Sequence, residues 1–204
     1  MFILISSENR IKNEGAICDE FFQCGLPLLH LRKPGEDKSY FRDLLKTISP
    51  IYHPKISLHQ HHDLQEEFKI GGIHFTEKYR NSFGEKLTTE LEKLEKSGMR
   101  TSSSFHSLKD LSKTNFDYCF LSPVFDSISK SNYPGHKTKV YPSQKKIIAL
   151  GGIRDTNIKE TKDLGYSGVA VLGSVWNSSN PIKAFEKLLL KYQEVYPQKA
   201  KVYA

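Results

Sequence analysis

Residues 147–174 read IIALGGIRDTNIKETKDLGYSGVAVLGS, and this stretch decides the fold. Two short apolar runs, Ile147–Leu150 and Val169–Leu172, flank a segment with helical spacing, Asp155–Leu164. Each run ends in small residues, Gly151-Gly152 and Gly173-Ser174, at the point where a helix is expected to begin. A strand, a helix and a second strand in this order are typical of a parallel βαβ unit.

The same alternation continues through the rest of the chain, which predicts eight strands. The apolar runs are Phe2–Ile5, Leu28–Leu31, Ile56–Leu58, Ile73–Phe75, Thr101–Phe105, Tyr118–Leu121, Ile147–Leu150 and Val169–Leu172. Helices are expected at Glu8–Cys24, Asp37–Thr47, Asp63–Phe68, Gly84–Ser97, Leu108–Lys113, Asp155–Leu164 and Pro181–Tyr196. Eight such units in about 200 residues indicate a (β/α)8 TIM barrel near its lower size limit. An open doubly wound sheet is the alternative, although no GxGxxG motif follows the first strand.

No linker or repeat divides the chain, so residues 1–204 are interpreted as one domain. The segment 126–145, DSISKSNYPGHKTKVYPSQK, interrupts the alternation after the sixth strand. A connection of this length without an apolar period is usually functional. We therefore predict that it is a lid over the active site.

Composition excludes several classes of protein. The chain has 38% hydrophobic and 26% charged residues, close to the average of globular proteins. We expect a cytoplasmic protein without contact to a membrane, because no apolar run has the length of a signal h-region or a membrane span. The three cysteines form no CxxC pair, so neither a disulfide framework nor a zinc knuckle is indicated.

The net charge of +7 favours an anionic ligand. Nucleic acid is not the expected partner, because the basic residues are scattered rather than arranged in a stripe with aromatic residues. The clearest anion signal lies at Gly151, Gly152, Gly173 and Ser174, because barrels often bind phosphate after strands seven and eight. The alternative is that these small residues only permit tight strand-to-helix turns.

Polar residues that end the strands mark the active face of a barrel. His30 and Arg32 end the second strand, His59 and Gln60 the third, His74 the fourth, and Ser104 and His106 the fifth. His106 has the position of a general acid and base, and a capping or core histidine is the alternative. The run His59-Gln-His-His-Asp63 allows a metal site from His59 and His61, with a third ligand from His30, His74 or Asp63. A polar pocket wall is the simpler interpretation, and we predict no metal there.

The order of these motifs resembles the thiamine phosphate synthase/TenI family over nearly the whole chain. Residues 28–34, LLHLRKP, look like its QLREK segment; residues 72–75, GIHF, like GVHL; and residues 101–107, TSSSFHS, like GxSxHS. Residues 123–130, PVFDSISK, look like PVFPTxTK, and the last two strands look like AIGGI and GxAVxSxI.

The resemblance implies a small barrel that binds hydroxyethylthiazole phosphate at Gly152, Gly173 and Ser174. In the synthase branch, magnesium and a pyrimidine diphosphate take part, and Arg32, Ser127, Ser129 and Lys130 match the residues that hold the diphosphate. In the TenI branch, the histidine matched by His106 moves protons to aromatise a thiazole carboxylate phosphate.

The sequence departs from the synthase pattern at its carboxylates. The Asn-Asp pair after strand three aligns with His59-Gln60, the strand-four aspartate with Tyr79, and the QLREK lysine with Pro34, although Lys33 could partly substitute. Magnesium prefers oxygen ligands. We therefore expect a thiazole tautomerase without a cofactor, in which His106 is the acid and base and Ser104 or His30 orients the substrate, with His59, Gln60 and His74 around the pocket.

Two alternatives remain open. One is a divergent synthase that uses magnesium and hydroxymethylpyrimidine diphosphate, and the other is a thiazole phosphate binder without activity. The expected partner is a phosphorylated thiazole, and a homodimer is also allowed.

Overall fold

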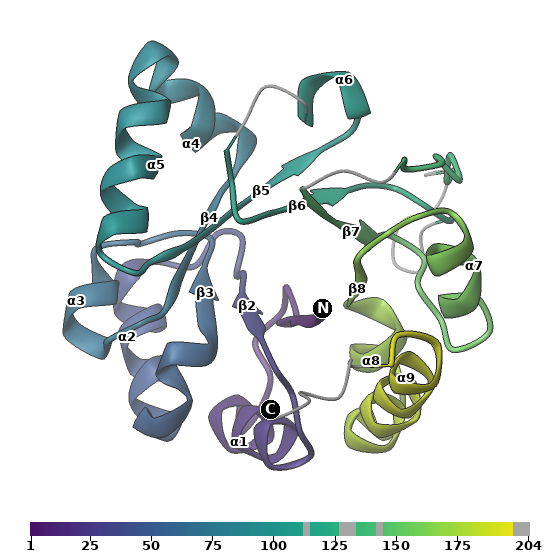
Figure 1. The fold of residues 1–204 in the computed structure, drawn as a ribbon. Helices are drawn as coiled ribbons and strands as arrows, with labels where there is room; N and C mark the ends of the chain where they lie inside the picture. The colour runs from purple at the N-terminus through teal and green to yellow at the C-terminus, as the bar shows by residue number, and fades with distance from the viewer. Residues whose placement is uncertain (112–114, 127–133, 142–144, 198–204) are drawn as a thin grey trace, which may run out of the picture.

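The computed structural model describes residues 1–111, 115–126, 134–141 and 145–197, and its eight strands close into one parallel barrel in sequence order (Figure 1). Every strand pairs in parallel with its neighbours along the chain, and β1 also pairs with β8. The strands are β1 Phe2–Ile5, β2 Leu29–Leu31, β3 Ile56–Leu58, β4 Gly72–Phe75, β5 Arg100–Phe105, β6 Tyr118–Leu121, β7 Lys146–Leu150 and β8 Gly168–Val171. The predicted barrel is confirmed.

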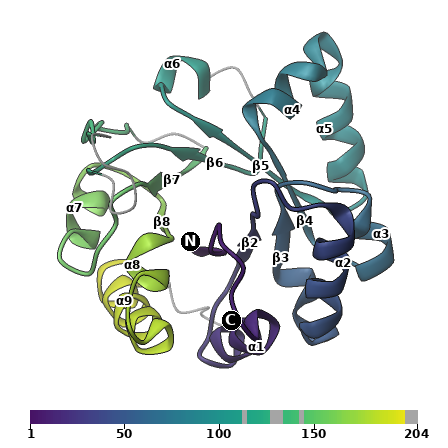
Figure 2. The ribbon, with the colours of Figure 1, turned by 180° about the vertical axis from the view of Figure 1, so that it is seen from behind.

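Helices form a ring outside the strands, as both sides of the molecule show (Figures 1 and 2). The α-helices are α1 Glu14–Gln23, α2 Lys38–Thr47, α3 Leu64–Phe68, α4 Glu77–Ser82, α5 Leu87–Lys96, α6 Leu108–Leu111, α7 Ile158–Asp163, α8 Gly173–Trp176 and α9 Pro181–Val195. Two 3-10 helices, η1 Pro50–Lys55 and η2 Gly84–Lys86, lie among the connections. None of the helices in the described ranges has the length and apolar character of a membrane span.

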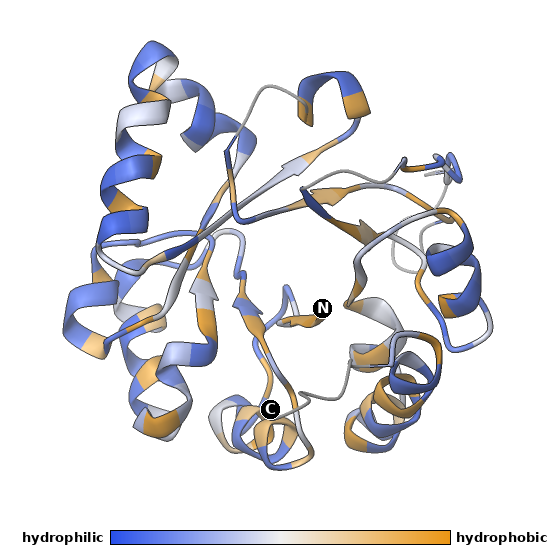
Figure 3. Cartoon of the chain, viewed as in Figure 1, coloured by the Kyte–Doolittle hydropathy of each residue, from blue (hydrophilic) through white to orange (hydrophobic). Residues whose placement is uncertain are grey.

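Successive side chains of a strand point to opposite sides of the barrel wall, and the apolar ones form two layers of core. One layer lies between the strands and the helices, and the other lies inside the barrel. Outward residues such as Phe2, Leu29, Ile56 and Val169 pack with the inner faces of the helices in one large apolar cluster. Figure 3 shows hydrophobic residues concentrated in the strands and interspersed with hydrophilic ones along α9. The alternation follows from the strand period of two residues, which sends successive side chains to opposite faces.

The interior of the barrel is divided into an apolar and a polar half. Ile3, Ile148 and Ala170 belong to a small buried apolar cluster with Tyr118 and Phe120. Strands β2 to β5 instead bury polar side chains at alternate positions: His30, Ser57, His74 and Ser102, each at most 2% exposed. Barrel interiors are usually filled with branched apolar residues. The polar half is therefore a special feature of this chain.

Two helix predictions differ from the structure. The first helix begins at Glu14 rather than at Glu8, because Asn13 has a left-handed φ of 57° and residues before it form a loop. Helix α4 was not expected; Thr76 begins it by accepting a hydrogen bond from the Tyr79 amide through its side chain. The loop before α1 follows the end of β1, and helix α4 follows the end of β4. Both segments therefore lie at the active face of the barrel, and both differences concern the site.

The predicted lid, residues 126–145, lies partly outside the described residues. In its described part, the amides of His136 and Lys137 donate to the carbonyls of Pro123 and Val124, and Val140 donates to Leu164. Val140 is buried. Residues 134–141 thus pack beside the end of β6 and against α7, and none of them lines the cavity described below. Their role as a lid stays a prediction.

Candidate active site

A cavity of about 330 Å³ opens where the strands end. Every strand or the loop that follows it contributes to its wall, as expected at the active face of a TIM barrel. The lining residues are Ile5, Glu8, Arg32, His59, His74, Thr76, Glu77, Ser104, His106, Phe120, Ser122, Pro123, Leu150, Gly151 and Leu172. The cavity thus brings together the predicted residues Arg32, His59, His74, Ser104, His106 and Gly151.

His106 follows β5 and is held in one tautomer. Its Nδ1 lies 2.8 Å from the carbonyl oxygen of Ser122. A carbonyl oxygen only accepts, so Nδ1 carries a proton and donates it there. In the neutral ring Nε2 then keeps its lone pair, which is what a general base requires.

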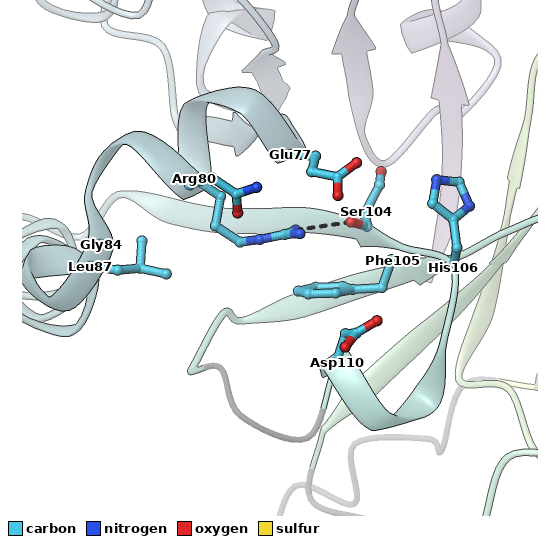
Figure 4. A pocket seen from close by; sticks show the side chains of 9 residues that line it. Glu77, Arg80, Gly84, Leu87, Ser104, Phe105, His106 and Asp110 are labelled. Carbon is cyan, nitrogen blue, oxygen red and sulfur yellow. Dashed lines mark hydrogen bonds between the residues drawn. The ribbon is translucent and has the colours of Figure 1, made fainter.

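A second cavity of about 620 Å³ adjoins the first between α4 and α6 (Figure 4). Glu77, Ser104 and His106 line both cavities. On the α4 side, Arg80 donates to the Ser104 carbonyl at 3.0 Å and to the Ser103 hydroxyl at 2.6 Å, and its guanidinium lies 4.2 Å from the centre of the Phe105 ring. His106 therefore stands at the junction of two cavities, and the guanidinium of Arg80 is held in the wall of the second one.

Three imidazoles form the floor of the barrel mouth. His30 Nδ1 lies 2.9 Å from His59 Nε2, and His30 Nε2 lies 2.7 Å from the Tyr118 hydroxyl. His74 contacts the Ser102 and Ser104 hydroxyls at 2.9 and 3.1 Å. The rings of His59 and His74 stack with 3.9 Å between centroids and 20° between planes.

Burial keeps these three imidazoles neutral. It lowers the pKa of His30 to about 3, with a further contribution from the positive charge of Arg100. The pKa values of His59 and His74 are also held well below the ordinary value, first by burial and then by the neighbouring imidazoles. Burial raises the pKa of Tyr118, against the hydrogen bonds of nearby serine hydroxyls. The floor is therefore polar but uncharged near neutral pH.

The described residues do not assemble a magnesium site. His30, His59 and His74 are the one group of three or more metal-binding side chains in the described ranges whose ligand atoms converge, within 4.8 Å of one another. Imidazoles are not the ligands of magnesium, which prefers oxygens. Two carboxylates line the first cavity, Glu8 and Glu77; Glu8 is bound to Arg32, and neither belongs to a converging group of three or more metal-binding side chains in the described ranges.

The histidines of the run 59–63 after β3 point in different directions. His61 contacts the Glu36 carbonyl at 3.1 Å and packs on Phe41. His62 packs outside the barrel against Phe75 and Tyr79. His59 instead stacks on His74, with which it lines the cavity.

Arg32 lies at the cavity with its charge paired. Its guanidinium is bound to Glu8, and both side chains are partly exposed, 35% and 43%. Lys33 points elsewhere: it is fully buried and its ammonium lies 2.6 Å from Glu14. Lys33 therefore does not replace the family's lysine, and Arg32 is the cation that β2 offers to a ligand.

Small residues after β7 and β8 only partly share one cavity. Gly151 and Leu172 line the first cavity, whereas Gly173 and Ser174 line a neighbouring one with Arg154 and Asn177. Gly151 and Gly152 have φ of 97° and 65°, and a Cβ on Gly152 would lie 2.3 Å from the Asp126 carbonyl oxygen. The Ser174 hydroxyl is buried without a hydrogen-bond partner in the described structure. The glycines are thus required by the turn, and Ser174 has an unused polar atom.

Other predicted residues lie away from the cavity. His30 lies one layer beneath it, where it is hydrogen-bonded to His59, which lines the cavity. Gln60 exchanges hydrogen bonds with the backbone of Lys33. Ser127, Ser129 and Lys130 lie outside the described residues, so their predicted diphosphate contacts stay a prediction.

Sequence reasoning missed Glu8, Tyr118 and Ser102 as parts of this region. Glu8 was placed in a helix, although the left-handed Asn13 puts it in a loop at the barrel mouth. Tyr118 and Ser102 sit at inward positions of their strands, in register with each other. A polar residue at alternate positions of a predicted barrel strand is the signal that would have found them.

Comparisons with known proteins agree with this architecture. The family model described as "Thiamine monophosphate synthase" matches residues 2–175. The thiamine-phosphate synthase of Staphylococcus epidermidis is 24% identical over 217 residues, covering 94% of this chain and 95% of that protein. That of Vibrio parahaemolyticus is 34% identical over 79 residues, 36% of this chain and 39% of that protein.

Two solved structures have the same fold. The thiamine phosphate pyrophosphorylase of Bacteroides thetaiotaomicron is 28% identical with a TM-score of 0.71, covering 93% of this chain and 96% of that one. That of Pyrococcus furiosus is 19% identical with a TM-score of 0.73, covering 95% and 96%. The family model extends across most of the barrel, including every strand and the cavity that they surround. The chain therefore belongs to the thiamine monophosphate synthase family of enzymes.

Proposed function

We propose that this protein is a thiazole tautomerase that acts on a thiazole carboxylate phosphate without a metal ion. The observation that carries the proposal is the geometry of His106, whose Nδ1–H is fixed by the Ser122 carbonyl so that Nε2 keeps its lone pair at the cavity. Moving a proton between ring atoms requires such an acid–base group and no leaving group. General acid–base catalysis of this kind contributes about 10²–10⁴ in rate.

The phosphate of the substrate has candidate ligands on the β7 and β8 side. The amides of Gly173 and Ser174, at the start of α8, have no acceptor among the described residues, and the Ser174 hydroxyl lacks a partner. Arg154 lines the same cavity. Uncommitted N–H groups beside a cation favour a phosphate. The substrate ring would then lie over the neutral floor of His59 and His74.

A divergent synthase is the second candidate, because the curated relatives named above are thiamine-phosphate synthases. That reaction would place a pyrimidine diphosphate near Arg32. The tautomerase is preferred because the two carboxylates that line the cavity in the described structure, Glu8 and Glu77, belong to no converging group of three or more metal-binding side chains, and Glu8 is bound to Arg32. A cytoplasmic location and a homodimer stay predictions.

Replacing His106 by Asn tests the proposal. We expect kcat for tautomerisation of the thiazole carboxylate phosphate to fall by about 10²–10⁴. His61→Asn is the matched control, because His61 lies outside the cavity and its left-handed φ of 52° suits Asn. Unchanged turnover in His106→Asn, measured by product chromatography, would exclude His106 as the acid and base.

A further inference from the structure

The opposite end of the barrel holds a cavity that shares no lining residue with the cavities described above. This cavity, here called the basal cavity, has a volume of about 620 Å³. Phe2 and Arg100, at the starts of β1 and β5, both line it, so it lies where the strands begin. The active face of a TIM barrel lies where the strands end. A ligand in the basal cavity would therefore be separate from the substrate.

Basic residues occupy corresponding positions on alternate strands at this end of the barrel. Lys55 directly precedes β3, Arg100 begins β5 and Lys146 begins β7. In a closed parallel barrel, side chains from alternate strands meet in one layer of the interior. Arg100 and Lys146 stand two residues before the buried inward residues Ser102 and Ile148, so the strand period of two directs them to the same side. The layer that closes this end of the barrel is therefore basic.

The positive charge in the wall of the basal cavity has no negative counterpart there. Lys55, Arg100 and Lys162 line the cavity, and its described lining residues include no Asp or Glu. None of these three cations forms an ion pair with a described residue. Asp117 accepts two hydrogen bonds at the start of β5, and Asp163 ends α7, but neither lines the cavity. Three positive charges therefore line one cavity without a carboxylate to neutralise them.

Neutral groups hold two of these cations in place. Arg100 donates through Nη2 to the carbonyl oxygens of Pro54 and Ile56 at 2.8 and 3.4 Å, and its Nε is buried without a partner among the described residues. Lys162 donates to the Val195 carbonyl at 2.6 Å. Carbonyl oxygens orient a cation but do not cancel its charge, so an anion in the cavity is attracted at close range. The cations are therefore positioned for a negatively charged ligand.

Aromatic side chains form another part of the wall. The rings of Tyr192 and Tyr196 stack with 4.9 Å between centroids and 19° between planes. Phe2 meets Tyr192 edge-on, with 5.4 Å between centroids. All three line the basal cavity together with Leu28. An apolar wall of rings beside cations suits a ligand that joins a flat ring to an anionic group.

We propose that the basal cavity is a second ligand site, which binds a phosphorylated aromatic small molecule. The phosphate lies among Lys55, Arg100 and Lys162, because its oxygens accept charge-assisted hydrogen bonds from ammonium and guanidinium groups. The ring packs against Tyr192 and Leu28. The volume is typical of small-molecule sites, which enclose about 300–1,000 Å³. The proposal does not depend on the proposed tautomerase function, because the two cavities share no residue.

Titration of the protein with phenyl phosphate, followed in ¹H–¹³C methyl spectra, tests the proposal. Leu28 lines the basal cavity and Leu172 lines the catalytic cavity, so the two sites are observed separately in one experiment. We expect the Leu28 signals to shift and to saturate as the probe is added. Leu28 signals that do not move, or that move without saturating, would overturn the proposal, whatever Leu172 does.

Lys55→Met combined with Lys162→Met removes two of the three cations and leaves the aromatic wall intact. We expect the Kd from the Leu28 shift to rise by about tenfold, because each exposed ion pair contributes up to about fivefold. The Leu172 response stays at its wild-type value. Replacing both lysines by arginine keeps the charges and is expected to preserve the Kd. Lys159→Met is the matched control, because Lys159 is an exposed lysine of the same helix, α7, that does not line the cavity. An unchanged Kd in the double methionine variant, or an equal rise in the control, would contradict the site.

Phenol and inorganic phosphate test the two parts of the ligand separately. We expect both to shift the Leu28 signals with a weaker affinity than phenyl phosphate. Added salt is expected to weaken binding of phenyl phosphate and not that of phenol, because salt screens exposed charges. Phenol that binds as tightly as phenyl phosphate would exclude a role of the cations. Inorganic phosphate that binds as tightly would exclude a role of the aromatic wall.

Discussion

Glu8 lies outside the recognised motifs, yet it neutralises the positive charge that Arg32 brings to the site. Arg32 persists from the family's QLREK segment, but Glu8 binds its guanidinium at the edge of the cavity. An anionic ligand must compete with that carboxylate. The pair therefore tunes anion affinity and is expected to weaken binding of a diphosphate more than that of a neutral ring.

Glu8→Gln releases Arg32 for ligands. We expect the Kd for inorganic diphosphate, measured by calorimetry, to fall by a factor of about 1.4 to 5, since an exposed ion pair is worth ~0.2–1 kcal/mol. Glu36→Gln is the control, because it breaks a similar pair with Arg10 that does not line the cavity. Equal or weaker binding by Glu8→Gln would mean that Arg32 does not meet the anion.

At the scale of single residues, sequence motifs identified six of the fifteen residues that line the cavity, but not the depth at which each side chain lies. His106, Ser104, His59 and His74 were placed at strand ends and do line the cavity. His30 follows the same pattern, yet its side chain lies one layer lower, because side-chain depth depends on strand stagger in the closed barrel. Glu8 was missed because the left-handed turn at Asn13 gives only a weak sequence signal.

The buried histidines His30, His59 and His74 make the free energy of unfolding depend on pH. Their pKa values are lowered in the native protein; that of His30 is about 3. A native pKa below the unfolded value means that the unfolded chain binds more protons as the pH falls. The free energy of unfolding is therefore highest above the pKa of histidine in the unfolded chain, about 6.5. It decreases as the pH falls from there toward the pKa in the native protein.

Between pH 6 and pH 4, we expect the free energy of unfolding to fall by up to about 1.4 kcal/mol per pH unit for each such histidine. Urea titrations at several pH values would measure this slope. His30→Gln is expected to make the slope shallower while keeping a polar side chain beside Tyr118. A slope that is the same in the variant would contradict the assignment of His30 as neutral in the native state.

The loop after β2 is attached to α1 by a buried ion pair. Lys33 and Glu14 are 0% and 1% exposed in their side chains, and their charged atoms are 2.6 Å apart. Lys33 also donates to the Asn9 carbonyl at 2.6 Å. The pair holds the loop that carries Arg32 against the start of α1, so it acts on the site through structure alone.

Lys33→Met leaves the Glu14 carboxylate buried without its partner. We expect a loss of about 3–5 kcal/mol in the free energy of unfolding, the usual effect of breaking a buried pair. The double variant Lys33→Met with Glu14→Leu is expected to recover much of that loss, because no unpaired charge remains. Urea unfolding would measure both, and a double variant less stable than Lys33→Met would contradict this interpretation.

For the whole molecule, the order of strands was predictable because the strand signals are local. Apolar runs of three to six residues are separated by helical spacing, and a parallel connection leaves few topologies. The polar half of the interior was not predicted, because deciding which polar residues meet requires the register between four strands. The chemistry of the site depends on that register.

The most direct test of the account is one assay of the purified protein with thiazole carboxylate phosphate and hydroxymethylpyrimidine diphosphate, with and without magnesium, read by product chromatography. We predict that the thiazole isomerises equally in both conditions and that no thiamine phosphate forms. Magnesium-dependent formation of thiamine phosphate would contradict the proposal and would require a magnesium site that His59, Gln60 and Tyr79 do not provide.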